Sequence, residues 1–159
     1  MRSTVLRPGL LLLGLAFSTT RSLNAQFLYA GFGGGPTPVS AEGWGNRNWS
    51  GMVGYQGRGA LGARLSGVET ASRLWLTAEL TYQLTPAVRT LRPYALFGPG
   101  YVLDFSEDDV LVSAGAGLRV QAHRLLFFFG EARLHTILGS PSDGPNTILP
   151  VTVGLGVGR

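Results

Sequence analysis

Three ionisable side chains recur at every second position of the segment FFFGEARLHT, residues 127–136: Glu131, Arg133 and His135. In an extended chain this spacing places all three on one face of a strand. A carboxylate, a guanidinium and an imidazole on one face could line a polar pore or a proton path, or they could form an ion-paired network. Because an unpaired buried charge is strongly unfavourable, we expect the paired network.

The same alternation places other polar residues on the matching faces of neighbouring segments. The predicted polar network consists of Arg64, Glu79, Arg119, Glu131, Arg133 and His135, with Gln83, Gln121 and His123 on the same faces. If these segments form one closed sheet, the network fills its interior.

His135 also raises an enzymatic hypothesis. A hydrolase needs a hydroxyl nucleophile beside a histidine base, and Ser140, Ser142 and Asp143 follow His135 closely in the chain. However, His135 shares the face of Glu131, and the serines lie in a Gly/Pro-rich segment without a catalytic spacing. We therefore expect no enzymatic activity and assign no catalytic residue.

No cofactor and no metal is predicted. The acidic run Glu107–Asp109, with Asp104 nearby, could bind a divalent cation, but such a run is more often a solvated loop. The glycine-rich segment 31–36 lacks the Lys-Ser/Thr ending of a phosphate loop and no helix follows it. The chain has no Cys, which excludes disulfides and thiolate metal sites.

The first 25 residues have the layout of a secretory signal peptide. A basic start (MRSTVLR) precedes an apolar run, residues 8–18, that is too short to span a bilayer, and a cut after Ala25 is predicted. One domain, residues 26–159, remains. The net charge of +4 includes three arginines of the leader, so the remaining chain is close to neutral and a nucleic-acid partner is not expected.

Apolar residues alternate with polar or small ones over most of this domain. The clearest segments are residues 74–84, 110–122, 127–135 and 149–157, and weaker ones are QFLYAGFGG, WSGMVGYQ, ALGARLSG and RPYALFGPGYVLD. Together they predict eight strands. In the first and fifth predicted strands, apolar residues occupy both odd and even positions, so the sequence does not decide which face of these strands points inward.

Long and short connections roughly alternate along the chain, as in an up-and-down barrel. GFGGGP, residues 31–36, is expected to end the first strand and to open a long loop that reaches Asn48. In the last strand, Gly154, Gly156 and Gly158 are expected to leave room inside for Arg119, Arg133 and Trp75, which is a large residue opposite a small one.

The composition of the polar faces decides which side points outward. Gly, Ser, Thr and Gln with few charges would make a poor water-facing surface but suit a narrow lumen. The apolar faces match a tilted membrane crossing of roughly nine to eleven residues. Aromatic residues near several strand ends are compatible with an interfacial girdle: Trp49, Tyr55, Tyr82, Tyr94 and Tyr101.

The predicted fold is all-β: an eight-stranded antiparallel up-and-down transmembrane β-barrel. Its narrow lumen is expected to be plugged by the polar network rather than open to diffusion. A secreted soluble barrel that binds a small apolar ligand remains an alternative, because a lipocalin-like barrel also alternates, with its apolar face inward.

Two stretches resemble a known family. GEARLHTILG with NTILPVTVGLGVG looks like the closing hairpin of small bacterial outer-membrane β-barrel proteins, the OmpA/OmpX-like group. RPYALFGPGYVL resembles their Pro-Tyr-x-x-x-Gly-x-Gly strand. One departure is the ending Val157, Gly158, Arg159, where such barrels typically finish on an aromatic residue.

The resemblance implies a cell outer membrane location, periplasmic chain ends and insertion by the barrel-assembly machinery. Outer-membrane lipids and lipopolysaccharide are the expected partners, and the expected role is membrane integrity or surface contact through the loops. An outer-membrane enzyme of the lipid A deacylase type remains a second alternative.

Overall fold

The computed structural model describes residues 27–39, 43–57, 59–70, 73–84, 90–103, 108–139 and 147–158. The predicted signal peptide, Ser140, Ser142, Asp143 and Arg159 lie outside these ranges, as do Asp104 and Glu107. No helix among the described residues has the length and hydropathy needed to span a membrane.

Every regular element in the described residues is a strand. The strands are β1 (Phe27–Val39), β2 (Gly43–Gln56), β3 (Leu61–Thr70), β4 (Arg73–Gln83), β5 (Leu91–Leu103), β6 (Asp108–Gln121), β7 (Leu126–Ile137), β8 (Thr147–Ile148) and β9 (Val151–Gly158).

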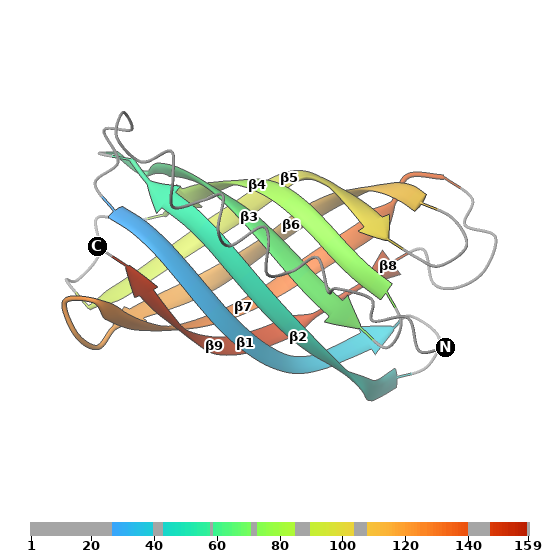
Figure 1. Ribbon diagram of the computed structural model, residues 1–159, viewed down its shortest axis with the longest axis horizontal. Helices are drawn as coiled ribbons and strands as arrows, with labels where there is room; N and C mark the ends of the chain where they lie inside the picture. Colours follow the sequence, from blue (N-terminus) through green and yellow to red (C-terminus); the bar gives the residue numbers. More distant parts are fainter. Residues whose placement is uncertain are drawn as a thin grey trace, which may run out of the picture.

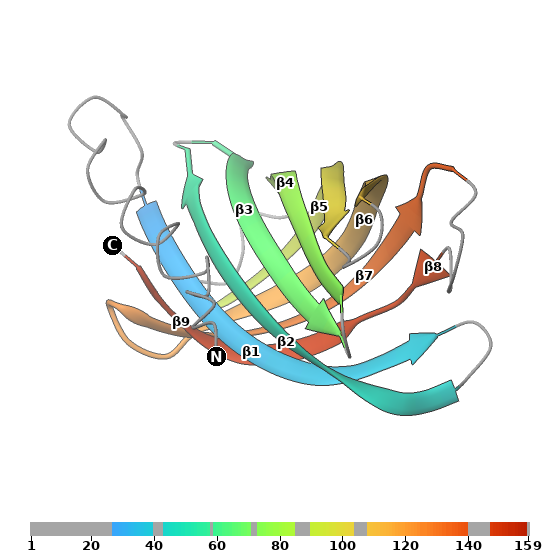
Figure 2. The same cartoon turned by 45° about the vertical axis from the view of Figure 1, so that its right-hand side comes forward.

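The strands close into one antiparallel barrel (Figures 1 and 2). From β1 to β7 each strand pairs with the next, and β1 also pairs with β8 and β9. Only Leu149 and Pro150 separate β8 from β9. The strands β8 and β9 both pair with β7 on their other side, so these two strands form one interrupted strand. The predicted eight-stranded antiparallel up-and-down barrel is confirmed.

The barrel has two different rims. The terminal rim is the end at which β1 starts and β9 ends, and it also carries the β2–β3, β4–β5 and β6–β7 connections (Figure 1). The loop rim is the opposite end, with the β1–β2, β3–β4, β5–β6 and β7–β8 connections. The strands run obliquely between the rims, as closure of a sheet into a barrel requires.

Side chains alternate strictly between the lumen and the outer wall. In β4, for example, Trp75, Thr77 and Glu79 are buried whereas Ala78 and Leu80 are exposed, which confirms the faces predicted from the sequence. The structure also decides the inward face of β1 and β5, which the sequence left undecided, because Tyr29 of β1 and Tyr94 of β5 both point inward. Tyr94 is only 5% exposed, so its assignment to an interfacial girdle was wrong.

The first loop was also wrongly placed. β1 continues through Gly33, Gly35 and Pro36 to Val39, and its pairing with β2 extends to Val39–Gly43. A Cβ at Gly33 or Gly35 would collide with the backbone of Val153 or Val151 in β9. These glycines therefore permit a close approach of two strands where the barrel closes, and they do not mark a turn.

The glycines of β9 do oppose large residues, but not the predicted ones. A Cβ on Gly154 would lie 2.6 Å from the ring of Phe129, and one on Gly156 would strike the ring of Phe127. The neighbouring strand β7 supplies both rings, with Phe127 paired to Gly156 and Phe129 to Gly154. Cross-strand partners occupy the space, in place of the arginines and the Trp expected there.

Candidate functional site: the lumen

The described lumen is filled by three layers of side chains. Near the terminal rim, Tyr29, Met52, Phe127 and Phe129 form one apolar cluster. Near the loop rim a second cluster is made of Val68, Trp75, Val102, Leu111, Ile137 and Ile148. The charged and hydroxyl-bearing side chains lie between the two clusters.

Arg64 is the centre of the middle layer. Its Nε donates to Glu79 Oε2 at 2.6 Å, and its Nη1 and Nη2 donate to the two oxygens of Glu131 at 2.6 and 2.8 Å. The second contact is bidentate, the geometry in which a guanidinium binds a carboxylate most specifically. One arginine from β3 thereby links β4 to β7 across the lumen.

Each carboxylate has further donors. Tyr94 donates its hydroxyl to Glu131 Oε1, and Ser113 and Ser66 donate to Glu79 at 2.8 and 3.1 Å. Arg133 pairs with Glu131, Nε to Oε2 at 3.2 Å, and its Nη1 donates to Ser66. Two guanidinium and two carboxylate groups thus form a cluster of zero formal net charge.

Arg119 and His135 are held differently from this cluster. The Arg119 guanidinium lies 4.2 Å from the ring centroid of Tyr29 and 4.7 Å from that of Phe127, which are cation–π distances. His135 is fully buried, and its ring lies 5.8 Å from the ring of Trp75. Neither imidazole nitrogen is hydrogen-bonded within the described part of the chain.

All six predicted network residues therefore lie inside the barrel, and four of them form one bonded cluster: Arg64, Glu79, Glu131 and Arg133. His123 does not belong to the lumen, because it is exposed in the β6–β7 turn. Gln121 bonds the backbone of that turn.

Sequence reasoning missed Tyr94, Ser66 and Ser113 as members of the network. The two serines share a strand face with Arg64 and Arg119, respectively, so their parity could have identified them. Tyr94 was hidden because apolar residues occupy both parities of its strand.

A second polar contact fastens the barrel where its first and last strands meet. Asn48 of β2 is buried, and its Nδ2 lies within hydrogen-bond distance of Thr37 Oγ1 at 2.9 Å and of the Val151 carbonyl at 3.2 Å. Thr152 donates to Asn48 Oδ1 at 3.1 Å. One amide side chain therefore joins β1, β2 and β9.

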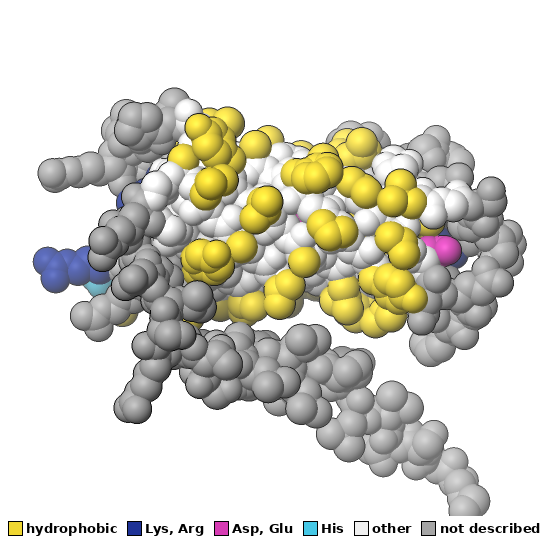
Figure 3. All heavy atoms as spheres, turned by 90° about the horizontal axis from the view of Figure 1, so that it is seen from above, with side chains coloured by type: hydrophobic (Ala, Val, Ile, Leu, Met, Phe, Trp, Pro, Cys, Tyr) yellow, Lys and Arg dark blue, Asp and Glu magenta, His cyan; other side chains and the backbone are white. Residues whose placement is uncertain are grey.

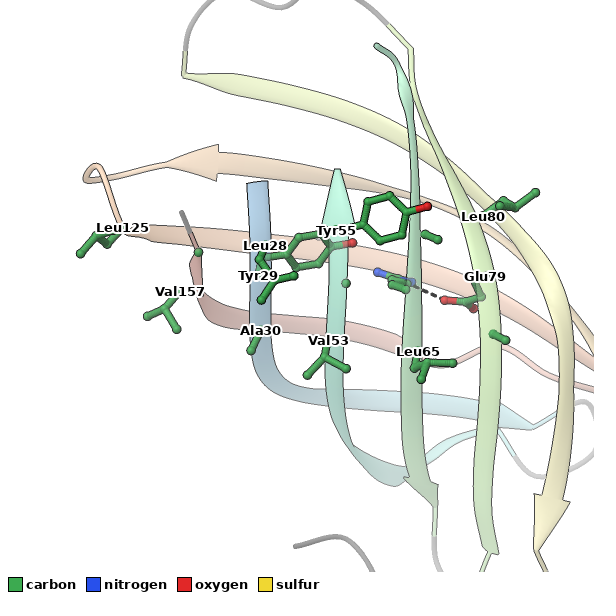
Figure 4. A pocket seen from close by; sticks show the side chains of 15 residues that line it. Leu28, Tyr29, Ala30, Val53, Tyr55, Leu65, Glu79, Leu80, Leu125 and Val157 are labelled. Atoms are coloured by element: carbon green, nitrogen blue, oxygen red, sulfur yellow. Dashed lines mark hydrogen bonds and ion pairs between the residues drawn. The ribbon is translucent and has the colours of Figure 1, made fainter. Parts of the chain in front are cut away.

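The outer wall of β1–β4 has an apolar concavity of about 800 Å³ (Figure 4). Its lining includes the outward-facing residues Leu28, Ala30, Val53, Ala63, Leu65, Ala78 and Leu80. Arg64 and Glu79, which form an ion pair, also contribute to it, and a dashed line at Glu79 in Figure 4 marks an interaction of this carboxylate. Ala30, Ala63 and Ala78 have small side chains, so the outer surface is recessed between the surrounding leucines.

The described residues do not assemble a catalytic or metal-binding group. His135 is enclosed in the lumen, while the serines and the aspartate considered with it lie outside the described ranges. No three His, Asp or Glu residues in the described strands and turns are placed to hold a metal ion. Among the described lumen residues, Arg64, Glu79, Glu131 and Arg133 pair their charges with one another.

Comparison with known proteins finds the same fold in solved membrane proteins. The N-terminal β-barrel domain of Pseudomonas aeruginosa OprF superposes with a TM-score of 0.63 at 18% identity, covering 86% of this chain and 98% of that domain. Neisserial surface protein A gives 0.64 at 12% identity, with coverages of 82% and 95%.

Ail, the attachment invasion locus protein of Yersinia pestis, gives a TM-score of 0.57 at 14% identity and is covered completely, with 86% of this chain matched. A further structure shows Ail in complex with the heparin analogue sucrose octasulfate. No family model and no curated protein sequence matches the chain. The chain therefore has the fold of small outer-membrane β-barrels, and a fold alone does not fix a function.

Proposed function

We propose that this chain is an integral barrel of the bacterial outer membrane with a structural or surface-contact role, and that its lumen is closed. The observation that carries the proposal is the reversed polarity of the barrel. Leu80, Phe97 and Val153 are 64%, 59% and 65% exposed on the outer wall, whereas Glu79, Glu131 and Arg133 are at most 3% exposed inside.

An apolar outer wall around a charged interior suits a lipid bilayer. Contiguous exposed apolar surface on this scale is unfavourable in water, and soluble proteins rarely carry it. A bilayer would cover it, and a closed barrel leaves no strand edge without hydrogen-bond partners in the hydrocarbon. The alternative of a soluble barrel with an apolar ligand inside finds no support, because ion pairs and aromatic rings fill the described lumen.

The closed lumen follows from the order of its layers. An ion that enters from the loop rim first meets an apolar cluster, which repels water and hydrated ions. From the terminal rim it meets the second cluster, whose rings of Tyr29 and Phe127 pack against the Arg119 guanidinium. Between the clusters, the charges of Arg64, Glu79, Glu131 and Arg133 already satisfy one another. We therefore infer a plug rather than a selective pore.

The proposal includes no enzymatic activity. A lipid A deacylase acts on a membrane-embedded substrate, so its histidine must reach the lipid, and His135 is enclosed inside the barrel. Lipid A from cells with and without the protein should therefore be identical. A deacylated species that depends on expression would contradict this part.

The expected partners are outer-membrane lipids and, during insertion, the barrel-assembly machinery. The loop rim differs from what binding of a polyanion such as the heparin analogue seen with Ail would need. Its described residues include three acids, Glu69, Asp108 and Asp109, against Arg47 and Arg73. Contact with lipopolysaccharide phosphates at this rim would therefore run through divalent cations.

Cell fractionation tests the location. The protein should be recovered from the outer membrane only with detergent, and its unheated form should migrate differently from its heated form on a gel. Recovery in the soluble periplasmic fraction, without a heat-dependent shift, would contradict the proposal.

A further inference from the structure

The two rims of the barrel carry opposite charge. The described residues at the terminal rim, 57, 59–60, 84, 90–92 and 122–125, include Arg92, His123 and Arg124 and neither Asp nor Glu. The loop rim is acidic, as described above. In Figure 3, basic side chains and a histidine gather at the left-hand end, an acidic side chain with a basic one beside it lies at the right-hand end, and apolar side chains cover the wall between them.

The turn that carries two of these basic residues has a well-defined backbone. Arg124 and His123 are exposed in the turn between β6 and β7. Backbone hydrogen bonds from Ala122 and His123 to the Leu126 carbonyl, both at 3.0 Å, fix this turn. Gly158 donates to the Leu125 carbonyl at 2.9 Å and ties the turn to the end of β9.

Arg92 adds positive charge at the same rim. It is half-buried at the start of β5 and directly opposite Arg119 in the register of β5 and β6. Like charges in opposed cross-strand positions are unfavourable by themselves. An anion bound at this mouth of the barrel would offset that repulsion.

Large apolar side chains lie directly beside these cations. Leu91 and Leu125, the chain neighbours of Arg92 and Arg124, are 44% and 48% exposed. Further exposed residues at this rim are Tyr55, Leu61, Tyr82 and Leu84. The exposed turn that carries Arg124 therefore lies where the apolar wall ends, which in a bilayer is the level of the lipid phosphates. Arg92, two residues before the inward-facing Tyr94, lies on the lumen face of the same rim.

We propose that the terminal rim binds the phosphate groups of anionic glycerophospholipids in the leaflet that it faces. This inference rests on the proposed membrane location and adds the headgroup chemistry and the rim that recognises it. Guanidinium groups bind phosphate oxygens in a bidentate manner. The adjoining leucines and tyrosines favour a phosphate that is attached to acyl chains over a free anion.

Lipid retention during purification tests the proposal. The folded barrel in detergent is incubated with equal amounts of phosphatidylglycerol and phosphatidylcholine, and retained lipid is counted by native mass spectrometry. Wild type should retain phosphatidylglycerol preferentially. Arg124→Gln should lower the ratio of retained phosphatidylglycerol to retained phosphatidylcholine about fivefold. Adding Arg92→Gln to this variant should lower the ratio further.

Arg47→Gln is the matched control, because Arg47 is an exposed arginine near the loop rim. It should leave the ratio unchanged, and a heat-dependent gel shift shows that each variant is folded. A wild-type ratio near one, or equal losses in Arg47→Gln and Arg124→Gln, would overturn the inference.

Soluble glycerophosphate separates a lipid site from a general anion site. It should not displace phosphatidylglycerol at equal concentration, and full displacement would contradict a lipid-specific rim. The two proposals fail differently. A chain that never inserts into bilayers refutes the membrane location, whereas an inserted barrel without lipid preference refutes only this inference.

Discussion

Glu131 accepts more contacts than any other single carboxylate described in the lumen. It binds Arg64 through both oxygens, accepts a hydrogen bond from Tyr94 and pairs with Arg133. Two strands besides its own, β3 through Arg64 and β5 through Tyr94, therefore depend directly on this one charge. A buried charge that loses its partner is not rescued by water, so the loss is large.

Glu131→Gln should lower the free energy of unfolding by about 3–5 kcal/mol, because it leaves two guanidinium groups facing only Glu79. Denaturant unfolding of the barrel in lipid vesicles measures this change. Glu69→Gln, an exposed glutamate of β3, is the control and should change stability by less than about 0.5 kcal/mol. A loss below about 1 kcal/mol for Glu131→Gln would show that the network is not a stabilising plug.

At this scale the sequence predicted which ionisable residues point inward but not which of them bond. Parity along β7 was sufficient for Glu131 and Arg133. It could not show that Arg119 is held by aromatic rings, since that depends on Tyr29 and Phe127 from strands far apart in sequence. His123 was misplaced because β6 ends at Gln121, its last residue paired with β7. His123 lies in the turn that follows, where the alternation of the strand no longer holds.

At the scale of the elements, the closure of the barrel depends on glycines that allow close packing. Gly156 of β9 lies against the ring of Phe127, and Gly33 of β1 lies against the backbone of β9. Gly51, in contrast, would place a Cβ in open space. Identical residues thus have different roles according to the face and the neighbouring strand.

Gly156→Ala should destabilise the barrel by about 1–3 kcal/mol, because the new methyl group overlaps the Phe127 ring. The additional change Phe127→Leu should recover part of this loss, seen as a coupling of at least about 0.5 kcal/mol in a double-mutant cycle. Gly51→Ala, the matched control, should be neutral or slightly stabilising. Equal losses for Gly156→Ala and Gly51→Ala would contradict the packing role.

The strands themselves were largely predictable, because a period of two with one apolar face is a strong signal. The segment 31–36 was not, since Gly and Pro are read as turn residues when no partner strand is known. The requirement of a close approach to β9 became visible only with the register.

For the whole molecule, two apolar clusters lie on either side of the ion-paired layer, and the Arg119 guanidinium packs against the rings of one of them. Purified barrel should therefore produce no stable channel steps in planar lipid bilayers. A reproducible wild-type conductance that disappears in Arg119→Ala would show that the lumen conducts and that Arg119 lines the path.

The orientation of its faces is the central claim, and two tryptophans report on it directly. Trp49 is 58% exposed on the outer wall, stacked on Phe32, whereas Trp75 is 1% exposed inside. The sequence has one further tryptophan, Trp44, which is replaced by Phe in both test proteins. The first variant also carries Trp75→Phe and keeps only Trp49, and the second also carries Trp49→Phe and keeps only Trp75. Both are folded into vesicles whose lipids carry bromine on the acyl chains. We expect strong fluorescence quenching of Trp49 and little quenching of Trp75, whereas equal quenching of both, or none of Trp49, would contradict the account.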